Sequence, residues 1–317
     1  MIDGLLLIVG LLFLIKAAGL LVKGASIVAS RLGISPLIVG LTVVSFGTSM
    51  PEMLVTLTAG LQQNADLAIA NVVGSNIANV LLILGVAAII RPLPVRNSTI
   101  VSEIPFSLIA ALLVGFLANA ALFSDHHELS ISRLDGGILL FFFLLFMLYI
   151  YKSSREYEST VSQVVASGKL GHAVFQIALG VVGLYFGGQW VVSGAVGFAQ
   201  TWGVDDALVG LTIVAIGTSA PELVASAVAA YRNETDIAVG NVVGSNIFNL
   251  LWVLGLTSSI VELPFKVITN TDLAMVIMSS ALIIVAMVSS RRYTVLRSHG
   301  ILFICLYVAY LFYVVQR

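Results

Sequence analysis

Charged residues are scarce in this sequence, since Asp, Glu, Lys and Arg together make up only 10% of its 317 residues. A soluble globular chain carries about 25% of these residues. Hydrophobic residues make up 59% of the chain, and its mean hydropathy is +1.07. These values exclude an ordinary soluble domain and predict a polytopic protein of the lipid bilayer.

Several kinds of motif are also missing. The formal net charge is -1 and there is no basic stretch, so the sequence predicts no nucleic-acid partner. The one cysteine, Cys305, lies in an apolar run and is interpreted as a buried structural thiol. The absence of a nucleotide-binding loop, a zinc motif and a nucleophile elbow argues against ATP-driven pumping and intramembrane proteolysis. We therefore expect neither an enzyme nor a bound cofactor, and no obligate protein partner is evident.

What the chain does contain is a series of apolar stretches. A bilayer-spanning helix needs about 20 mainly apolar residues. The sequence therefore predicts an all-α polytopic membrane protein with ten transmembrane helices. They lie at about 2–22, 36–61, 67–90, 100–119, 135–151, 171–196, 207–230, 236–260, 272–289 and 298–315. The polar segment 152–170 is predicted to be a cytoplasmic linker between a first half, 1–151, and a second half, 171–317.

Lys and Arg are distributed unevenly between the predicted loops. Eleven follow helices 1, 3, 5, 7 and 9, and three lie on the opposite side. Cytoplasmic loops carry the excess of these residues in membrane proteins. The distribution therefore places both termini on the non-cytoplasmic side of a plasma (inner) membrane.

The strongest feature of the sequence is a repeat. Residues 40–85 and 210–255 align without a gap at a constant offset of 170, and 23 of the 46 positions are identical. Five predicted helices separate equivalent positions, so the two halves have opposite orientations in the membrane. Such inverted repeats are typical of secondary transporters, whose substrate site lies at the repeat interface near the midplane. We therefore expect transport by alternating access.

Each repeat places a glutamate inside an apolar helix, Glu52 in the first and Glu222 in the second. A carboxylate at membrane depth is costly unless a cation or polar neighbours compensate it. A proline precedes each glutamate, which predicts that helices 2 and 7 are broken near the midplane. The break would free carbonyl oxygens around Ser45 and Ala215. A Ser-x-x-Glu helix cap is a second interpretation of the same residues, compatible with the first.

Further oxygen donors follow at helical spacing. Residues 71, 75 and 79 share one face of helix 3, and 241, 245 and 249 share one face of helix 8. Ligation is the favoured role of the serines and of the last asparagine in each trio. For the remaining asparagines, 71, 76, 241 and 246, helix packing is an equal alternative. The candidate donors are all oxygens, which suits hard cations such as calcium; soft metals prefer Cys and His. A flexible site of this kind also suits sodium.

The motifs GTSMPE with GSNIAN, and GTSAPE with GSNIFN, resemble the two alpha-repeats of the calcium/cation antiporter superfamily. They most resemble its sodium/calcium exchanger branch, including the compact prokaryotic members, and the resemblance covers essentially the whole chain. It implies ten helices and exchange of cytosolic calcium for external sodium at one alternating site. It also implies that helices 1 and 6 slide as a pair against the other eight.

The resemblance further implies a set of ligands for the transported ions, calcium and sodium. The central carboxylates come first, then threonines with backbone and side-chain oxygens, nearby carbonyls, serines lining the outer and inner sodium positions, and flanking asparagines. In that order the residues are Glu52 and Glu222; Thr48 and Thr218; Ser45 and Ala215; Ser49, Ser75, Ser219 and Ser245; and Asn79 and Asn249. Some relatives have aspartate at one of the last two positions. With asparagine at both, the formal charge is -2 and the sodium stoichiometry stays open.

Three other functions are weighed against sodium/calcium exchange. The first is calcium/proton (or potassium-assisted) exchange, in which both glutamates carry protons during the return step. The second is a passive cation channel, which would need a continuous path with weak sites. The third is an ion-dependent carrier of an organic solute, for which the repeats offer no apolar or basic pocket residues.

Overall fold

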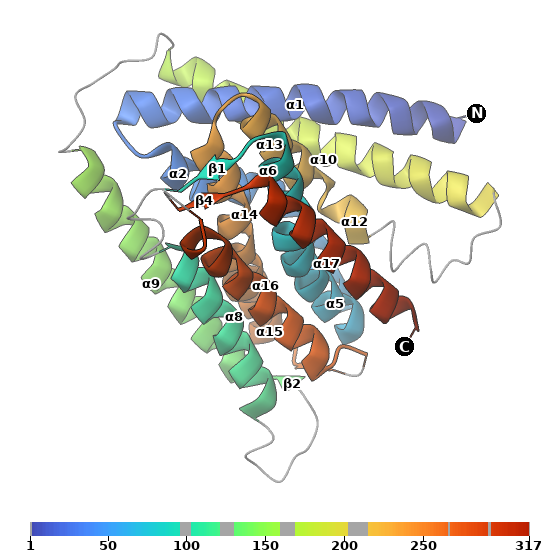
Figure 1. The fold of residues 1–317 in the computed structure, drawn as a ribbon. Coiled ribbons are helices and arrows are strands. Elements are labelled where there is room, and N and C mark those ends of the chain that lie inside the picture. Colours follow the sequence, from blue (N-terminus) through green and yellow to red (C-terminus); the bar gives the residue numbers. More distant parts are fainter. Residues whose placement is uncertain are drawn as a thin grey trace.

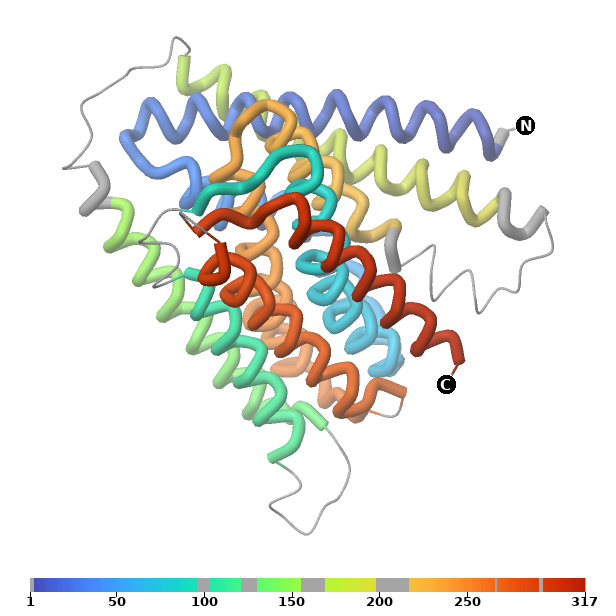
Figure 2. The backbone as a smooth tube through the Cα atoms, in the orientation of Figure 1, coloured from blue at the N-terminus to red at the C-terminus, as the bar shows by residue number. Residues whose placement is uncertain are grey.

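The structure is a computed structural model that describes residues 2–95, 103–120, 130–158, 169–201, 215–265, 267–290 and 293–316. It is almost entirely helical over these residues, which confirms the all-α part of the predicted fold class (Figure 1). Two long helices, α1 (Ile2–Leu32) and α10 (Leu170–Thr201), pack against each other and cross one side of a bundle that the other helices form (Figure 2).

The remaining helices follow the order of the two repeats. In the first half they are α2 (Pro36–Val39), η1 (Gly40–Val44), α3 (Ser45–Thr48), α4 (Met50–Leu61), α5 (Ala65–Ala78), η2 (Asn79–Leu84), α6 (Gly85–Ile90), α8 (Glu103–Asn119) and α9 (Arg133–Glu158). In the second half they are α12 (Ala215–Thr218), α13 (Ala220–Tyr231), α14 (Thr235–Ile247), η5 (Phe248–Val253), α15 (Leu254–Ile260), α16 (Asn270–Val288) and α17 (Arg297–Gln316). The η segments are π-helical turns within longer helices.

Within the described residues, seven helices are long and apolar enough to cross a membrane, or eight if a bent pair counts as one span. The chain is therefore a multi-pass membrane protein. The start of the predicted helix at 207–230 and the first residues of the one at 100–119 lie outside the described residues. The number of ten spans accordingly stays a prediction.

The bent pair lies where the first proline predicts a break. Helix 36–48 and helix 50–61 meet at an angle of 48°. Ser49 separates them with φ -83° and ψ 6°, and Pro51 stands in the first turn of the second helix. In the second half, Ser219 separates α12 from α13 with φ -87° and ψ 7°. The same local backbone therefore recurs at the offset of 170, because proline cannot donate a bond to the carbonyl four residues back.

Glycines hold α1 and α10 in close contact. A Cβ built on Gly180 would stand 2.8 Å from the backbone nitrogen of Leu21, and one on Gly187 would stand 3.2 Å from that of Leu14. Small residues let helix backbones approach in this way. A hydrogen bond joins the pair of long helices to the bundle: the Gly19 carbonyl accepts from the Arg232 guanidinium at 2.9 Å.

The substitution Gly180→Leu is expected to force the two long helices apart and destabilise the protein, since overpacking costs about 1–3 kcal/mol. A lower midpoint of thermal unfolding in detergent would report it. Gly171→Leu is the matched control, because a Cβ at Gly171, on the same helix, would meet nothing within 4 Å. Equal midpoints for the two variants would contradict this account of the packing.

Two short antiparallel ladders join the halves at opposite ends of the bundle (Figure 1). At one end β1 (Leu93–Pro94) pairs with β4 (Thr294–Val295). At the other end β2 (Ser130–Ile131) pairs with β3 (Leu263–Pro264). Each ladder therefore takes one strand from each half of the chain.

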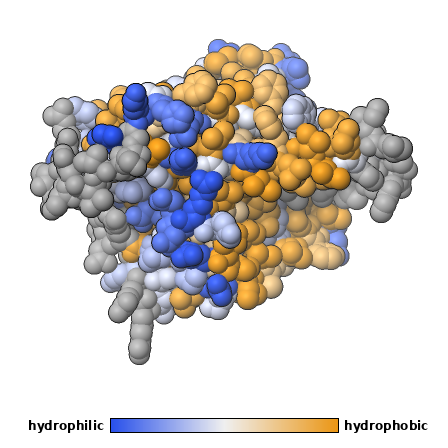
Figure 3. Space-filling view, turned by 90° about the horizontal axis from the view of Figure 1, so that it is seen from above, coloured by the Kyte–Doolittle hydropathy of each residue, from blue (hydrophilic) through white to orange (hydrophobic). Residues whose placement is uncertain are grey.

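The surface agrees with a membrane environment. Large apolar side chains on the outer faces of the helices are exposed, for example Leu5, Phe116 and Phe312. Seen from above, hydrophilic residues gather near the middle of the face, and hydrophobic residues cover its right side and much of its upper edge (Figure 3). Cys305 is exposed, so its interpretation as a buried thiol is wrong. The sequence missed this because an apolar run does not reveal which face of a helix meets lipid.

The predicted linker begins as helix, because α9 continues to Glu158. Residues 159–168 of that linker lie outside the described residues. The division of the chain into 1–151, 152–170 and 171–317 therefore stays a prediction.

Candidate cation-binding site

The two glutamates of the repeats lie at equivalent places in the fold. Glu52 is in the first turn of α4 and Glu222 is in the first turn of α13, each directly after a proline in the second position of its helix. Their exposed fractions are 1% and 0%. Both carboxyl groups are thus held deep in the protein, where they need polar or cationic partners.

Each glutamate takes a hydrogen bond from the other half of the chain. The Ser219 hydroxyl donates to Oε1 of Glu52 at 3.1 Å, and the Ser49 hydroxyl donates to Oε1 of Glu222 at 2.9 Å. The serines therefore serve as partners of the opposite repeat. Each serine stands at the N-cap position, but neither hydroxyl makes a capping hydrogen bond to its own helix, so the interpretation as a capping box is wrong.

Asn71 of α5 and Asn241 of α14 support the glutamates from behind. The Asn71 side-chain nitrogen donates to the Glu52 carbonyl at 3.2 Å, and that of Asn241 donates to the Glu222 carbonyl at 3.4 Å. Each nitrogen also donates to a hydroxyl 2.9 Å away, on Thr56 or Ser226. These two hydroxyls are absent from the sequence prediction, although their equivalence at the offset of 170 was a usable signal.

The threonines before each break complete this reciprocal pattern. The Thr48 hydroxyl donates to Oδ1 of Asn241 at 3.1 Å, and the Thr218 hydroxyl donates to Oδ1 of Asn71 at 3.4 Å. Both asparagine amides thus use their nitrogen and oxygen within the protein. The structure therefore favours positioning over ligation for Asn71 and Asn241.

The asparagines further along the helices break the symmetry. The Asn79 nitrogen donates to Oδ1 of Asn246 at 3.0 Å, whereas the Asn249 nitrogen donates to the Ser75 hydroxyl at 3.1 Å. The Asn246 nitrogen donates to the carbonyl of Asn76 at 3.3 Å. Helices α5 with η2 and α14 with η5 are therefore in direct polar contact across the repeat interface.

Several buried side-chain oxygens of these segments have no hydrogen-bond partner. They are Oε2 of Glu52 and of Glu222, Oδ1 of Asn76, of Asn79 and of Asn249, and Oγ of Ser245. Unpaired buried polar atoms are costly, so each needs an explanation. A hard cation would supply one, because it takes carboxylate, amide and hydroxyl oxygens as ligands.

The sequence predicts that the break frees the carbonyls of Ser45 and Ala215, but the Ser45 carbonyl is hydrogen-bonded within the protein. The Ser45 carbonyl accepts from the Ser49 backbone at 2.9 Å and from the Thr48 hydroxyl at 3.3 Å. The break does not free this carbonyl. Pro51 has no N–H, so the carbonyl that loses its donor is that of Gly47, four residues earlier. Ala215 begins α12, which places its backbone in the equivalent segment.

Comparison with known proteins agrees with this geometry. The sequence profile described as "Sodium/calcium exchanger protein" matches residues 3–152 and 172–316. The chain belongs to the sodium/calcium exchanger family. As an exchanger, it belongs to a family of cation transporters, which is in keeping with the expectation that it is not an enzyme.

Individual exchangers and related proteins match over most of their length. The sodium/calcium exchanger MaX1 of Methanosarcina acetivorans is 30% identical over 344 residues, with 98% of this chain and 97% of MaX1 covered. The inner membrane protein YrbG of Escherichia coli is 39% identical over 264 residues, with 80% and 79% covered. The solved structure of the sodium-calcium exchanger NCX_Mj superposes with a TM-score of 0.82 at 28% identity, and 98% of each chain is covered. These matches identify the chain as an exchanger of the compact prokaryotic type.

Proposed function

We propose that this protein exchanges sodium for calcium across the membrane at a single site between its two repeats. The observation that carries the proposal is the pair of buried carboxyl groups, Glu52 and Glu222, each bonded by a serine of the opposite half and each with one oxygen unpaired. Two carboxylates carry a charge of -2, which one calcium ion or two sodium ions balance. The names of MaX1 and NCX_Mj as sodium/calcium exchangers support the choice of ions.

The proposed ligands are those that the motifs indicate. The carboxylates hold either ion at the centre, and oxygens of both breaks and of the facing helices surround it. Besides Glu52 and Glu222 the set comprises Thr48, Thr218, Ser49, Ser219, Ser75, Ser245, Asn79, Asn249, Ser45 and Ala215, the last two through their carbonyls. The oxygens of Asn79, Asn249 and Ser245 that lack a partner are the ones most directly available for a cation.

The packing of α10 supports alternating access. A Cβ on Gly47, before the first break, would meet Val181, and one on Gly217, before the second, would meet Val192. Helix α10 therefore lies against both breaks. Since glycines lock it to α1, a displacement of the pair would cover one approach to the site and open the other. In the proposed topology the chain spans the membrane ten times, as two halves of opposite orientation, with both termini outside the cytoplasm.

Transport assays in proteoliposomes test the function. Vesicles loaded with sodium and diluted into sodium-free medium are expected to take up calcium, whereas matched vesicles given only a pH gradient are not. Uptake driven by pH alone would replace the proposal with calcium/proton exchange. Calcium flux that persists without any counter-ion gradient would indicate a channel.

A further inference from the structure

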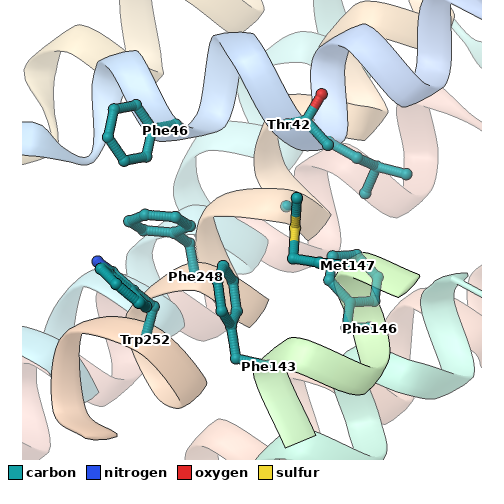
Figure 4. Close-up of a pocket in the computed structure, with 9 residues that line it drawn as sticks. Thr42, Phe46, Phe143, Phe146, Met147, Phe248 and Trp252 are labelled. Carbon is teal, nitrogen blue, oxygen red and sulfur yellow. The ribbon is translucent and has the colours of Figure 1, made fainter. Parts of the chain in front are cut away.

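An apolar pocket of about 320 Å³ lies between the first broken helix, α9 and the helix formed by α14 and η5 (Figure 4). Its wall consists of Leu41, Thr42, Phe46, Phe143, Phe146, Met147, Gly244, Phe248 and Trp252. The rings of Phe143, Phe248 and Trp252 cluster at one end, and Met147 and Phe146 lie beside them on the α9 side (Figure 4). A pocket of this size is within the range of pockets that hold small ligands, about 300–1,000 Å³.

Water has little to bind in this pocket, where Nε1 of Trp252 is a single buried donor without a hydrogen-bond partner. The hydroxyl of Thr42 already donates to the Ile38 carbonyl at 2.7 Å. Phe248 packs edge-on against Phe46 and Phe143, with ring centroids 5.1 Å and 5.5 Å apart, so the wall is largely aromatic. A buried water needs two to four polar partners. An apolar occupant therefore fits the pocket better than solvent.

The mouth of the pocket opens on a face that meets lipid. Phe46 and Met147, which line it, are 46% and 37% exposed. On α9 the neighbouring Phe141, Leu144 and Leu148 are exposed as well. In a multi-pass membrane protein such a face contacts hydrocarbon, so hydrocarbon is the medium that reaches the mouth.

The position of the pocket along the helices sets its depth. Phe46 follows Ser45 and lies two residues before Thr48, and Phe248 directly precedes Asn249. The pocket is therefore level with the candidate cation site. At the depth of a midplane site, lipid presents the ends of its chains and not its headgroups.

The aromatic residues that the repeats contribute to the pocket wall are not repeated in the other half of the sequence. Phe248 and Trp252 correspond to Ala78 and Leu82 at the offset of 170, and Phe46 corresponds to Ile216. The two repeats differ at these positions although they have identical residues close by on either side. The repeated motif therefore does not require the aromatic wall.

We propose that this pocket binds the terminal part of a bilayer lipid acyl chain. The chain would enter between α9 and the first broken helix and end against the Phe143, Phe248 and Trp252 rings. It would contact the reverse side of the segments that carry Ser45 and Asn249. The inference depends on the membrane location of the chain and not on which cations it exchanges.

Fluorescence quenching by brominated lipid tests the proposal, because Trp252 lies in the pocket wall. Trp190→Phe and Trp202→Phe leave Trp252 as the one tryptophan of the 317-residue chain. The full chain is reconstituted in vesicles of phosphatidylcholine brominated near the chain ends, and in unbrominated vesicles. Bromine quenches on contact, so a large loss of Trp252 emission is expected in the brominated vesicles.

A filled pocket distinguishes the bound chain from lipid that only surrounds the protein. Thr42→Phe places a ring in the pocket, whereas Val43→Phe places one on the adjacent lipid-exposed position, outside the wall. Quenching is expected to fall in Thr42→Phe and to stay at the parent level in Val43→Phe. Met147→Phe fills the pocket from α9 and serves if Thr42→Phe does not fold. Equal quenching in the parent and both filled variants, or no quenching in the parent, would overturn the proposal.

Discussion

Replacing Glu52 or Glu222 by glutamine is expected to abolish sodium-driven calcium uptake while the protein still inserts and folds. Each glutamine keeps the size of the side chain and an oxygen that can accept the bond from Ser219 or Ser49. It removes one of the two negative charges that balance calcium. A divalent ion at a buried site with a single carboxylate would carry an uncompensated charge, which is strongly unfavourable at membrane depth.

Uptake of radioactive calcium into sodium-loaded proteoliposomes measures this effect, with protein content and gel-filtration profile as the check on folding. Glu103→Gln is the matched control. Glu103 is also buried, but it lies on α8 and accepts a bond from Tyr149 at 3.2 Å, outside the repeated motifs. Uptake at the parent rate in either motif variant would refute the site, while loss in all three would point to a general effect on folding.

Replacing Ser49 or Ser219 by alanine is expected to weaken apparent calcium affinity by about 10- to 100-fold, since a hydrogen bond to a charged group contributes about 1.5–3 kcal/mol. Each substitution removes the bond to the carboxylate of the opposite repeat. Because the two bonds are equivalent at 2.9 Å and 3.1 Å, the two variants should lose similar amounts.

Calcium dependence of the initial uptake rate gives the apparent affinity. Ser107→Ala on α8 is the control, because Ser107 is equally buried and has no hydrogen-bond partner to lose. Parent affinity in both motif variants would show that the reciprocal bonds do not hold the carboxylates for the ion. A loss in only one variant would show that the site works asymmetrically despite its geometry.

Most of what the sequence predicts about the site comes from its internal repeat. Identical unusual residues at a constant offset identify Glu52 and Glu222 as equivalent, and proline before each glutamate predicts the interruption of the helix that the backbone shows at Ser49 and Ser219. These are local consequences of residue type. They do not depend on how the halves are placed.

The partners across the interface were not predictable in the same way. Ser49 stands three residues before Glu52, so the local pattern favours a cap on its own helix, yet its hydroxyl bonds Glu222. Whether a serine hydroxyl bonds an acceptor on its own helix or one in the other half depends on how closely the two halves approach. Glycine at 244 sets part of that approach, since a Cβ there would stand 2.6 Å from the Leu41 carbonyl and 2.7 Å from the Ser45 hydroxyl. The sequence shows the glycine but not what it faces.

The two strand ladders bear on whether either half of the chain could be stable alone. Leu93–Pro94 and Leu263–Pro264 are the same dipeptide at the offset of 170, and each pairs with a strand from the other half. A single half would therefore hold both kinds of strand and be unable to use either alone. Only the presence of both halves completes both ladders. The two halves are therefore expected to be stable only together.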